Sequence, residues 1–108
     1  MAVHHAEPEE VVNLQPLGSA LQHAKTTAIV KSKTFEAVRL IVHEGMNIAD
    51  HQVDGPIMLH CLEGHVKLGL GESAVELCAH QWIYLEGGTM HSVTGIQDSS
   101  LLLTILFQ

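Results

Sequence analysis

Basic residues are scarce in this sequence. Its 108 residues include five Lys and Arg against twelve Asp and Glu, which gives a formal net charge of -7. Binding to nucleic-acid phosphates requires clustered positive charge, and an anionic membrane surface attracts the same kind of cluster. The basic residues are instead scattered along the chain, at Lys25, Lys31, Lys33, Arg39 and Lys67. We therefore expect neither nucleic acid nor a membrane as a partner.

Long apolar runs and closely spaced cysteines are also missing. The longest apolar stretch, Leu101 to Phe107, is interrupted by Thr104 and is far too short to span a bilayer. The first ten residues have no basic start and no apolar core, so we expect no secretory signal and a cytoplasmic location. Cys61 and Cys78 form no C-x-x-C pair, and both are expected as free thiols.

The overall composition is typical of a folded globular domain. Hydrophobic residues make up 46% of the chain and charged residues only 16%, which argues against disorder. A chain of this length is expected to form one domain. Residues 1–24, which are acidic and contain Pro8 and Pro16, are interpreted as an N-terminal arm, with a short helix around residues 18–24 as an option. Residues 25–108 are then the folded domain.

From residue 25 the chain shows the pattern of short β-strands. Runs rich in Val, Ile, Leu and Phe are separated by Gly and Asp turns, which predicts an all-β, antiparallel sandwich or barrel. The predicted strands cover residues 27–31, 35–43, 57–63, 65–70, 74–78, 82–85, 91–96 and 101–107. The two runs around Glu63 and Gly64 are interpreted as a hairpin. The last run is apolar on both faces, so it needs cover from a dimer interface or from the arm.

Residues 45 to 64 carry the first part of a family pattern. Cupins, which are small jelly-roll barrels, have a first motif of the form G-x5-H-x-H-x3,4-E-x6-G. Gly45 and His51 fit its opening and Gly64 fits its close. The second histidine of the motif falls on Val53, and the glutamate falls on Ile57.

The second cupin motif, G-x5-P-x-G-x2-H-x3-N, is also matched in part. Gly88 and His91 fit it, whereas His80, Glu86 and Gly95 stand at its first glycine, its proline and its asparagine. The joint register of the five matching positions and the strand order make the chain resemble a small single-domain cupin. The resemblance implies an antiparallel double-stranded β-helix, or jelly-roll barrel.

The same resemblance suggests where a functional site would lie. In metal-binding cupins two first-motif histidines, a glutamate and a second-motif histidine hold the ion, and of these only His51 and His91 remain here. Two neutral imidazoles that face one cavity can bind a divalent ion such as Fe, Zn, Mn or Ni, but catalytic zinc normally has three protein ligands. A third ligand would have to come from the set Asp50, Asp54, His60 and Glu86. The alternative is two cavity histidines that hydrogen-bond water or backbone without a metal.

Several neighbours of the histidine pair are candidate ligand-binding residues. Ile57, Leu59 and Cys61 share one face of a predicted strand, and Tyr84 precedes the second motif. A thiol at Cys61 would act as a nucleophile only with a base and an activating environment; the alternative is a small core residue. For Tyr84 the alternative to stacking on a ligand is ordinary packing.

Two functional hypotheses follow from the sequence. The first is a small cupin-like protein that binds a small molecule in a cavity lined by His51 and His91. The second is a metal-dependent enzyme of the dioxygenase or isomerase type that uses the same two histidines. The resemblance also implies a homodimer formed by pairing of edge strands, which would protect open sheet edges.

Overall fold

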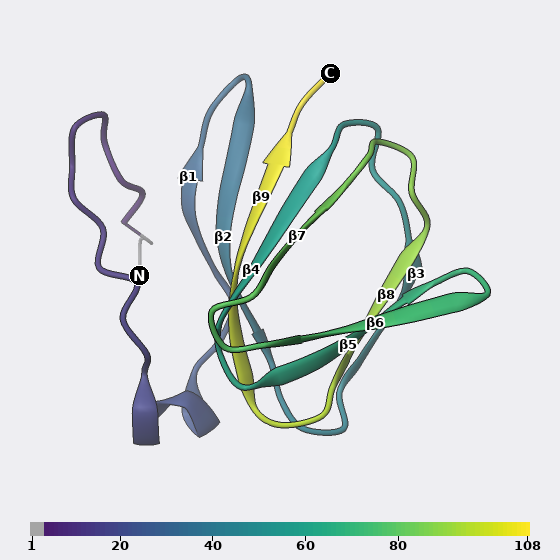
Figure 1. Ribbon diagram of the computed structural model, residues 1–108. Coiled ribbons are helices and arrows are strands. Elements are labelled where there is room, and N and C mark those ends of the chain that lie inside the picture. Colours follow the sequence, from purple (N-terminus) through teal and green to yellow (C-terminus); the bar gives the residue numbers. More distant parts are fainter. Residues whose placement is uncertain (1–3) are drawn as a thin grey trace.

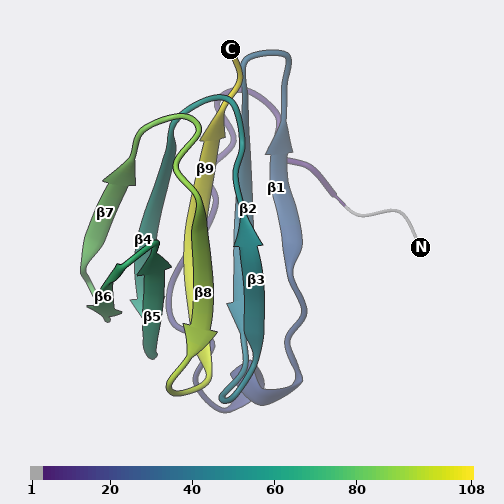
Figure 2. The same cartoon turned by 90° about the vertical axis from the view of Figure 1, so that its right-hand side faces the viewer.

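The computed structural model describes residues 4–108, and within them nine β-strands form two antiparallel sheets (Figures 1 and 2). One short 3-10 helix, η1 (Gly18–His23), precedes them. The strands are β1 (Thr27–Lys31), β2 (Phe35–Val42), β3 (Asn47–His51), β4 (Ile57–Glu63), β5 (His65–Leu70), β6 (Ser73–Cys78), β7 (Trp82–Leu85), β8 (His91–Gly95) and β9 (Ser99–Leu106). No helix in this part of the chain is long and apolar enough to cross a membrane.

The strand order interleaves the two halves of the chain. The larger sheet, called sheet A, has the order β1-β2-β9-β4-β7, and sheet B has the order β3-β8-β5-β6. The two sheets lie face to face in Figure 2. This is the predicted all-β jelly roll, except that the hydrogen bonding of the described strands leaves two separate sheets rather than a closed barrel.

The hydrophobic core fills the space between the sheets. Side chains alternate along each strand, so every second residue of β4, β5 and β9 points to this space. Leu59, Leu68 and Leu101 are among the largest side chains that are completely buried. Complete burial of a leucine side chain contributes about 1.5–3 kcal/mol, so this layer is the main source of stability.

The predicted hairpin around Glu63 and Gly64 is wrong. Strand β4 pairs with β7 and β9, whereas β5 pairs with β6 and β8, so the chain crosses here from sheet A to sheet B. Gly64 makes the crossing with φ +95°, and a Cβ atom at this position would lie 2.3 Å from the carbonyl oxygen of Asp98. The motif glycine is therefore required by a tight crossing and not by a two-residue turn.

One strand was not predicted from the sequence. Strand β3 has no apolar alternation, because Ile48 is its only residue that is not exposed. Its backbone is held by pairing with β8, in the register Asn47 to Thr94 and Ile48 to Val93. The tertiary partner, rather than local preference, makes this segment a strand.

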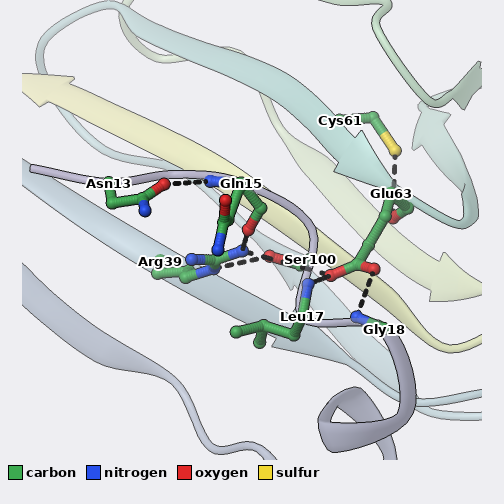
Figure 3. Close-up of polar contacts among 8 residues, drawn as sticks. All are labelled: Asn13, Gln15, Leu17, Gly18, Arg39, Cys61, Glu63 and Ser100. Carbon is green, nitrogen blue, oxygen red and sulfur yellow. Dashed lines mark hydrogen bonds and ion pairs between the residues drawn. The ribbon is translucent and has the colours of Figure 1, made fainter.

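The N-terminal arm is attached to sheet A by a largely buried carboxylate, whose side chain is 15% exposed (Figure 3). Glu63, at the end of β4, accepts hydrogen bonds from the backbone N–H groups of Leu17 (2.7 Å) and Gly18 (3.2 Å). The guanidinium of Arg39 lies 4.0 Å from the same carboxylate. Because these bonds join residues 46 and 45 positions apart, they fix where the arm meets the sheet.

Arg39 completes this attachment from β2, which is separated from β4 by β9. Its Nε donates to the hydroxyl of Ser100 (2.8 Å), and its Nη2 donates to the carbonyl oxygen of Gln15 (2.7 Å), as Figure 3 shows. Further along the arm, the N–H of Ala6 donates to the carbonyl oxygen of Ile29 on β1 (2.7 Å). The arm therefore contacts sheet A from β1 and β2 across to the end of β4.

Candidate functional site

Two histidines meet at the edge of sheet B. His51 ends β3, His91 begins β8, and the two are direct partners in the antiparallel ladder. Their ring centroids lie 4.2 Å apart, with the planes tilted by 57°. His91 is 4% exposed, whereas His51 is exposed to solvent. The two imidazoles that the sequence singled out are therefore neighbours in space.

Backbone carbonyls fix the orientation of both rings. Nδ1 of His51 donates to the carbonyl oxygen of Ala49 (3.0 Å), and Nδ1 of His91 donates to that of Thr89 (2.9 Å). A carbonyl oxygen can only accept, so Nδ1 carries the proton in each ring. In the neutral ring Nε2 then holds a free lone pair. Each histidine thus bonds the carbonyl two residues before it and leaves Nε2 for another partner.

A small apolar cavity lies beside the pair, between the two sheets. Its volume is about 110 Å³. The lining residues come from five strands and are Leu40, Ile48, His51, Ile57, Leu59, His91, Val93 and Leu103. Because His51 is exposed and also lines the cavity, the cavity is reached from solvent beside this ring. The site therefore combines two polar nitrogen groups with a wall of branched apolar side chains.

Of the other residues proposed from the sequence, two join this cavity and two lie elsewhere. Ile57 and Leu59 are buried and line it. Cys61 is completely buried in the core, outside this lining, and its Sγ–H contacts the carbonyl oxygens of Glu63 and Gly64. Burial raises the pKa of the Cys61 thiol to about 11, which opposes a nucleophilic role at neutral pH.

Tyr84 lies on the other side of sheet A. Its neighbours on β7, Ile83 and Leu85, pack into the core, so Tyr84 points to the outer face, where it is 50% exposed. The structure does not bring it to the histidine pair. The simple alternation of β7 contains this information, because the apolar Ile83 and Leu85 have the parity opposite to that of Tyr84.

Four lining residues were not singled out by the sequence. Leu40, Val93 and Leu103 sit on predicted strands, and Val93 shares the parity of His91. The alternation along this strand could therefore have identified Val93. It could not have identified Ile48, because the pairing of β3 with β8 shifts register between Ile48 and His51. Strict alternation would separate these two residues, whereas the irregularity lets both line the cavity.

The architecture is similar to solved structures over nearly the whole chain. A cupin superfamily protein from Desulfitobacterium hafniense superposes with a TM-score of 0.78 over 95% of this chain and 100% of its own, at 13% identity. A conserved Streptococcus pyogenes protein of unknown function gives 0.76 over 100% and 96%, at 15% identity. An RmlC-like cupin from Desulfovibrio desulfuricans gives 0.69 over 98% and 97%, at 19% identity. The chain has the cupin fold.

Sequence comparison adds nothing to this structural likeness. No protein-family model matches the chain, and no curated protein matches it. The solved cupin structures are too distant in sequence to transfer an activity or a ligand. The function must therefore be argued from the site.

The departures from the cupin motifs have visible structural outcomes. Ile57, at the motif glutamate, is an apolar wall of the cavity, and Val53, at the second histidine, packs against the core. His80 stands where the second motif has its first glycine and keeps a left-handed backbone, with φ +74°. The backbone path of the family is thus retained where its ligands and glycine are replaced.

The donor set fits a metal only in part. Both rings donate Nδ1–H to a backbone carbonyl and leave Nε2 free, as metal-binding imidazoles usually do. In the part of the chain that the structure describes, no group of three or more His, Cys, Asp and Glu is arranged to hold an ion. The sequence candidates for a third ligand, which were Asp50, Asp54, His60 and Glu86, do not form such a group with the pair. Two imidazoles alone fall short of a catalytic zinc site or an iron triad.

Proposed function

We propose that the chain binds a small, mainly apolar molecule with one polar group in the cavity beside His51 and His91. The observation that carries the proposal is the pair of imidazoles with Nδ1 tied to backbone carbonyls. Their Nε2 lone pairs are left for a ligand in an otherwise apolar lining. A few converging polar groups in an apolar pocket are a usual arrangement for ligand recognition.

Nε2 of the buried His91 needs a hydrogen-bond partner. No buried side-chain nitrogen or oxygen among the described residues lacks a hydrogen bond. Nε2 of His91 makes no bond to the protein, so it must border open space, where water or a ligand can reach it. A ligand group that donates a hydrogen bond, such as a hydroxyl or a neutral carboxylic acid, would satisfy it.

The volume limits the size of the ligand. An apolar cavity of about 150 Å³ can bind benzene. The cavity here measures about 110 Å³, which is smaller, so it holds a short chain of a few carbon atoms completely. A ring the size of phenol would have to extend past His51 toward solvent. The proposal therefore names the class of small phenols, alcohols and short carboxylic acids.

A paired set of probes tests this proposal. Phenol, benzyl alcohol and short carboxylic acids are compared with toluene by thermal shift and calorimetric titration of the purified protein. We expect the hydroxyl or acid probes to bind and toluene to bind less well. His51→Ala should lower the affinity of phenol by roughly tenfold, because one hydrogen bond to the ligand is lost.

The control removes a histidine that does not line the cavity. His65 lies on β5 and pairs with Glu76, so His65→Ala should bind phenol as the parent does. His51 is exposed, so its replacement tests binding with little cost to the fold. Equal affinity for phenol and toluene, or equal phenol affinity in the parent and His51→Ala, would contradict the proposal.

A two-histidine metal site is the second candidate function. The locked Nδ1–H form of both rings favours it, because metal-binding histidines usually donate their other N–H to a carbonyl or carboxylate. His51 and His91 would be the protein ligands, and water or a bound carboxylate would have to complete the coordination. Such an ion would activate a bound water or polarise a substrate oxygen, the chemistry of metal-dependent cupin enzymes.

Elemental analysis distinguishes the two candidates. The protein is dialysed against Fe, Zn, Mn or Ni and then against metal-free buffer, in parallel with His51→Ala and His65→Ala. About one ion per chain in the parent and in His65→Ala, lost in His51→Ala, would support the metal site. No ion above the level of His51→Ala would exclude it and leave small-molecule binding.

A further inference from the structure

A cysteine, a histidine and a glutamate lie together on the outer face of sheet B. Cys78 ends β6, His65 begins β5, and the two are direct partners where these strands run side by side (Figure 1). Glu76, two residues before Cys78, shares its orientation and hydrogen-bonds Nε2 of His65. The neighbours Val66 and Leu77 are buried in the core. The cluster therefore points away from the cavity beside the other histidine pair.

The backbone shows that His65 and Cys78 form the closer type of antiparallel pair. The N–H of His65 donates to the hydroxyl of Ser99 (2.9 Å). Its carbonyl oxygen accepts from the N–H groups of Ile96 (2.9 Å) and Gln97 (3.1 Å). Both backbone groups of His65 thus point away from β6, which makes its pair with Cys78 a non-hydrogen-bonded one. In such a pair the Cα atoms lie only about 4.5 Å apart and the side chains approach most closely.

A tight turn holds Cys78 in place at the end of β6. Its N–H donates to Oε1 of Gln81 (2.8 Å), and its carbonyl oxygen accepts from the N–H of Gln81 (3.0 Å). Because the turn satisfies both backbone groups, the last residue of β6 is not free to fray. The thiol of Cys78 therefore stays opposite His65, and rotation about χ1 is its main remaining freedom.

Glu76 sets the tautomer of His65. A carboxylate only accepts, so the proton of the neutral ring is on Nε2 and the lone pair is on Nδ1. Nδ1 is the ring nitrogen nearer the backbone and hence nearer the residue directly opposite. In the part of the chain that the structure describes, Nδ1 of His65 has no hydrogen-bond partner. A free basic nitrogen therefore borders the thiol of Cys78.

A thiol beside a histidine that a carboxylate orients is an arrangement that activates nucleophilic cysteines. Cys78 is exposed, whereas Cys61 is completely buried. The titratable groups that flank Cys78 are Glu76 on its own strand, His65 and Lys67 on β5, and His80 in the turn. Of the two thiols, Cys78 is thus the one that combines access with a base.

We infer that Cys78 is a thiol-modification site, at which a small disulfide forms a mixed disulfide with the help of His65. The thiol turns about χ1 toward Nδ1 of His65, which takes its proton. The Cys78 thiolate attacks one sulfur of the disulfide, so that a new S–S bond forms and the old one breaks. The second sulfur leaves as a thiolate and takes the proton from His65. Cys78 is oxidised and the small disulfide is reduced, so no other oxidant is needed.

The surroundings favour a disulfide over an acyl compound. Acyl transfer requires N–H donors for the oxyanion, but the N–H groups of Cys78 and His65 are already bonded to Gln81 and Ser99. Disulfide exchange requires only a thiolate and access to it. The site lies on the opposite face of sheet B from the cavity, so the inference does not depend on the proposed function.

Mass spectrometry with 2-hydroxyethyl disulfide tests the inference. The probe is neutral, so the net charge of -7 does not repel it. We expect one adduct on the native parent, removed by dithiothreitol and absent from Cys78→Ser. At pH 7 His65→Gln should react about three- to tenfold more slowly. The difference is limited because a thiolate stabilised by imidazolium forms at lower pH but is a weaker nucleophile.

The pH profile separates proton transfer from a merely structural effect. The rate of the parent should rise in two steps with pH, first as the thiolate–imidazolium pair forms and again as the imidazolium loses its proton. His65→Gln should show one step, that of a lone thiol. Glu76→Gln keeps the base but orients and stabilises it less, so its rate at pH 7 should lie between the two.

The matched control removes another imidazole close to the thiol. His80→Asn keeps a residue type that tolerates the φ of +74° in the turn, so it should react as the parent does. Circular dichroism checks that each variant is folded. Equal rates and a single step in both the parent and His65→Gln would overturn the inference. So would adduct formation in Cys78→Ser at the rate of the parent, or a His80→Asn variant as slow as His65→Gln.

Discussion

Replacing Glu63 by Gln should release the N-terminal arm from sheet A. The carboxylate accepts two backbone N–H groups, from Leu17 and Gly18, and faces Arg39 at 4.0 Å. The side chains of Glu63 and Arg39 are only 15% and 13% exposed, so water screens them little. A glutamine keeps one acceptor oxygen but turns an NH2 group toward N–H donors.

The size of the effect follows from these contacts. A hydrogen bond to a charged group contributes about 1.5–3 kcal/mol, and Gln can retain a neutral version of one of the two. The N···O distance to Arg39 is at the limit for an ion pair, which adds at most about 1 kcal/mol. We therefore expect Glu63→Gln to lower the free energy of unfolding by roughly 2–4 kcal/mol.

Urea unfolding measures the loss of stability, and hydrogen exchange of residues 4–24 measures the release of the arm. The control is Glu72→Gln, which removes the same charge from the exposed turn between β5 and β6. Its stability should stay within about 0.5 kcal/mol of the parent. The reasoning is refuted if Glu63→Gln and Glu72→Gln have the same stability and the same exchange rates in the arm.

Three further predictions concern single backbone and thiol positions. Gly64→Ala should lower the free energy of unfolding by at least about 3 kcal/mol, because the added Cβ would clash with a backbone oxygen and φ is left-handed. Gly71→Ala, where φ is also left-handed but nothing lies near the added Cβ, should lower it by about 1 kcal/mol in the same urea assay. His80→Gly should be tolerated and His80→Val should cost roughly 1–2 kcal/mol by thermal unfolding, since φ is +74° there and a branched side chain resists it. At pH 8 a thiol reagent should modify Cys78 quickly and Cys61 only after denaturation, because the raised pKa keeps Cys61 protonated until the pH approaches 11; rapid reaction of both thiols in the native protein would contradict this.

Most of the strands could be predicted because they follow from local patterns of apolar and polar residues. The runs from Ile57 to Glu63 and from His65 to Leu70 alternate as strands should, and the structure confirms both. The prediction that these two strands pair with each other as a hairpin was wrong. A turn at Gly64 is visible in the sequence, but whether it keeps the chain in one sheet depends on partners at β7, β8 and β9 that are distant in the sequence.

The candidate site was predicted in the same uneven way. His51 and His91 were identified by their register in two motifs, and Ile57 and Leu59 by alternation on one strand. Ile48 was missed because a register irregularity in β3 has no sequence signature. Cys61 and Tyr84 were proposed as ligand residues, yet the structure leaves one in the core and the other on the outer face of sheet A. The alternation along a strand predicts which side chains point into the core. It does not predict which of these core side chains line a cavity.

The most direct test of the central claim observes the two imidazoles while a ligand is added. Long-range proton–nitrogen NMR correlations report the tautomer of each histidine ring, and replacing His51 or His91 by Gln assigns the signals. The account predicts the Nδ1–H form for both rings in the free protein, and joint changes at both when phenol is added. An Nε2–H form, or changes confined to histidines outside the cavity, would contradict it.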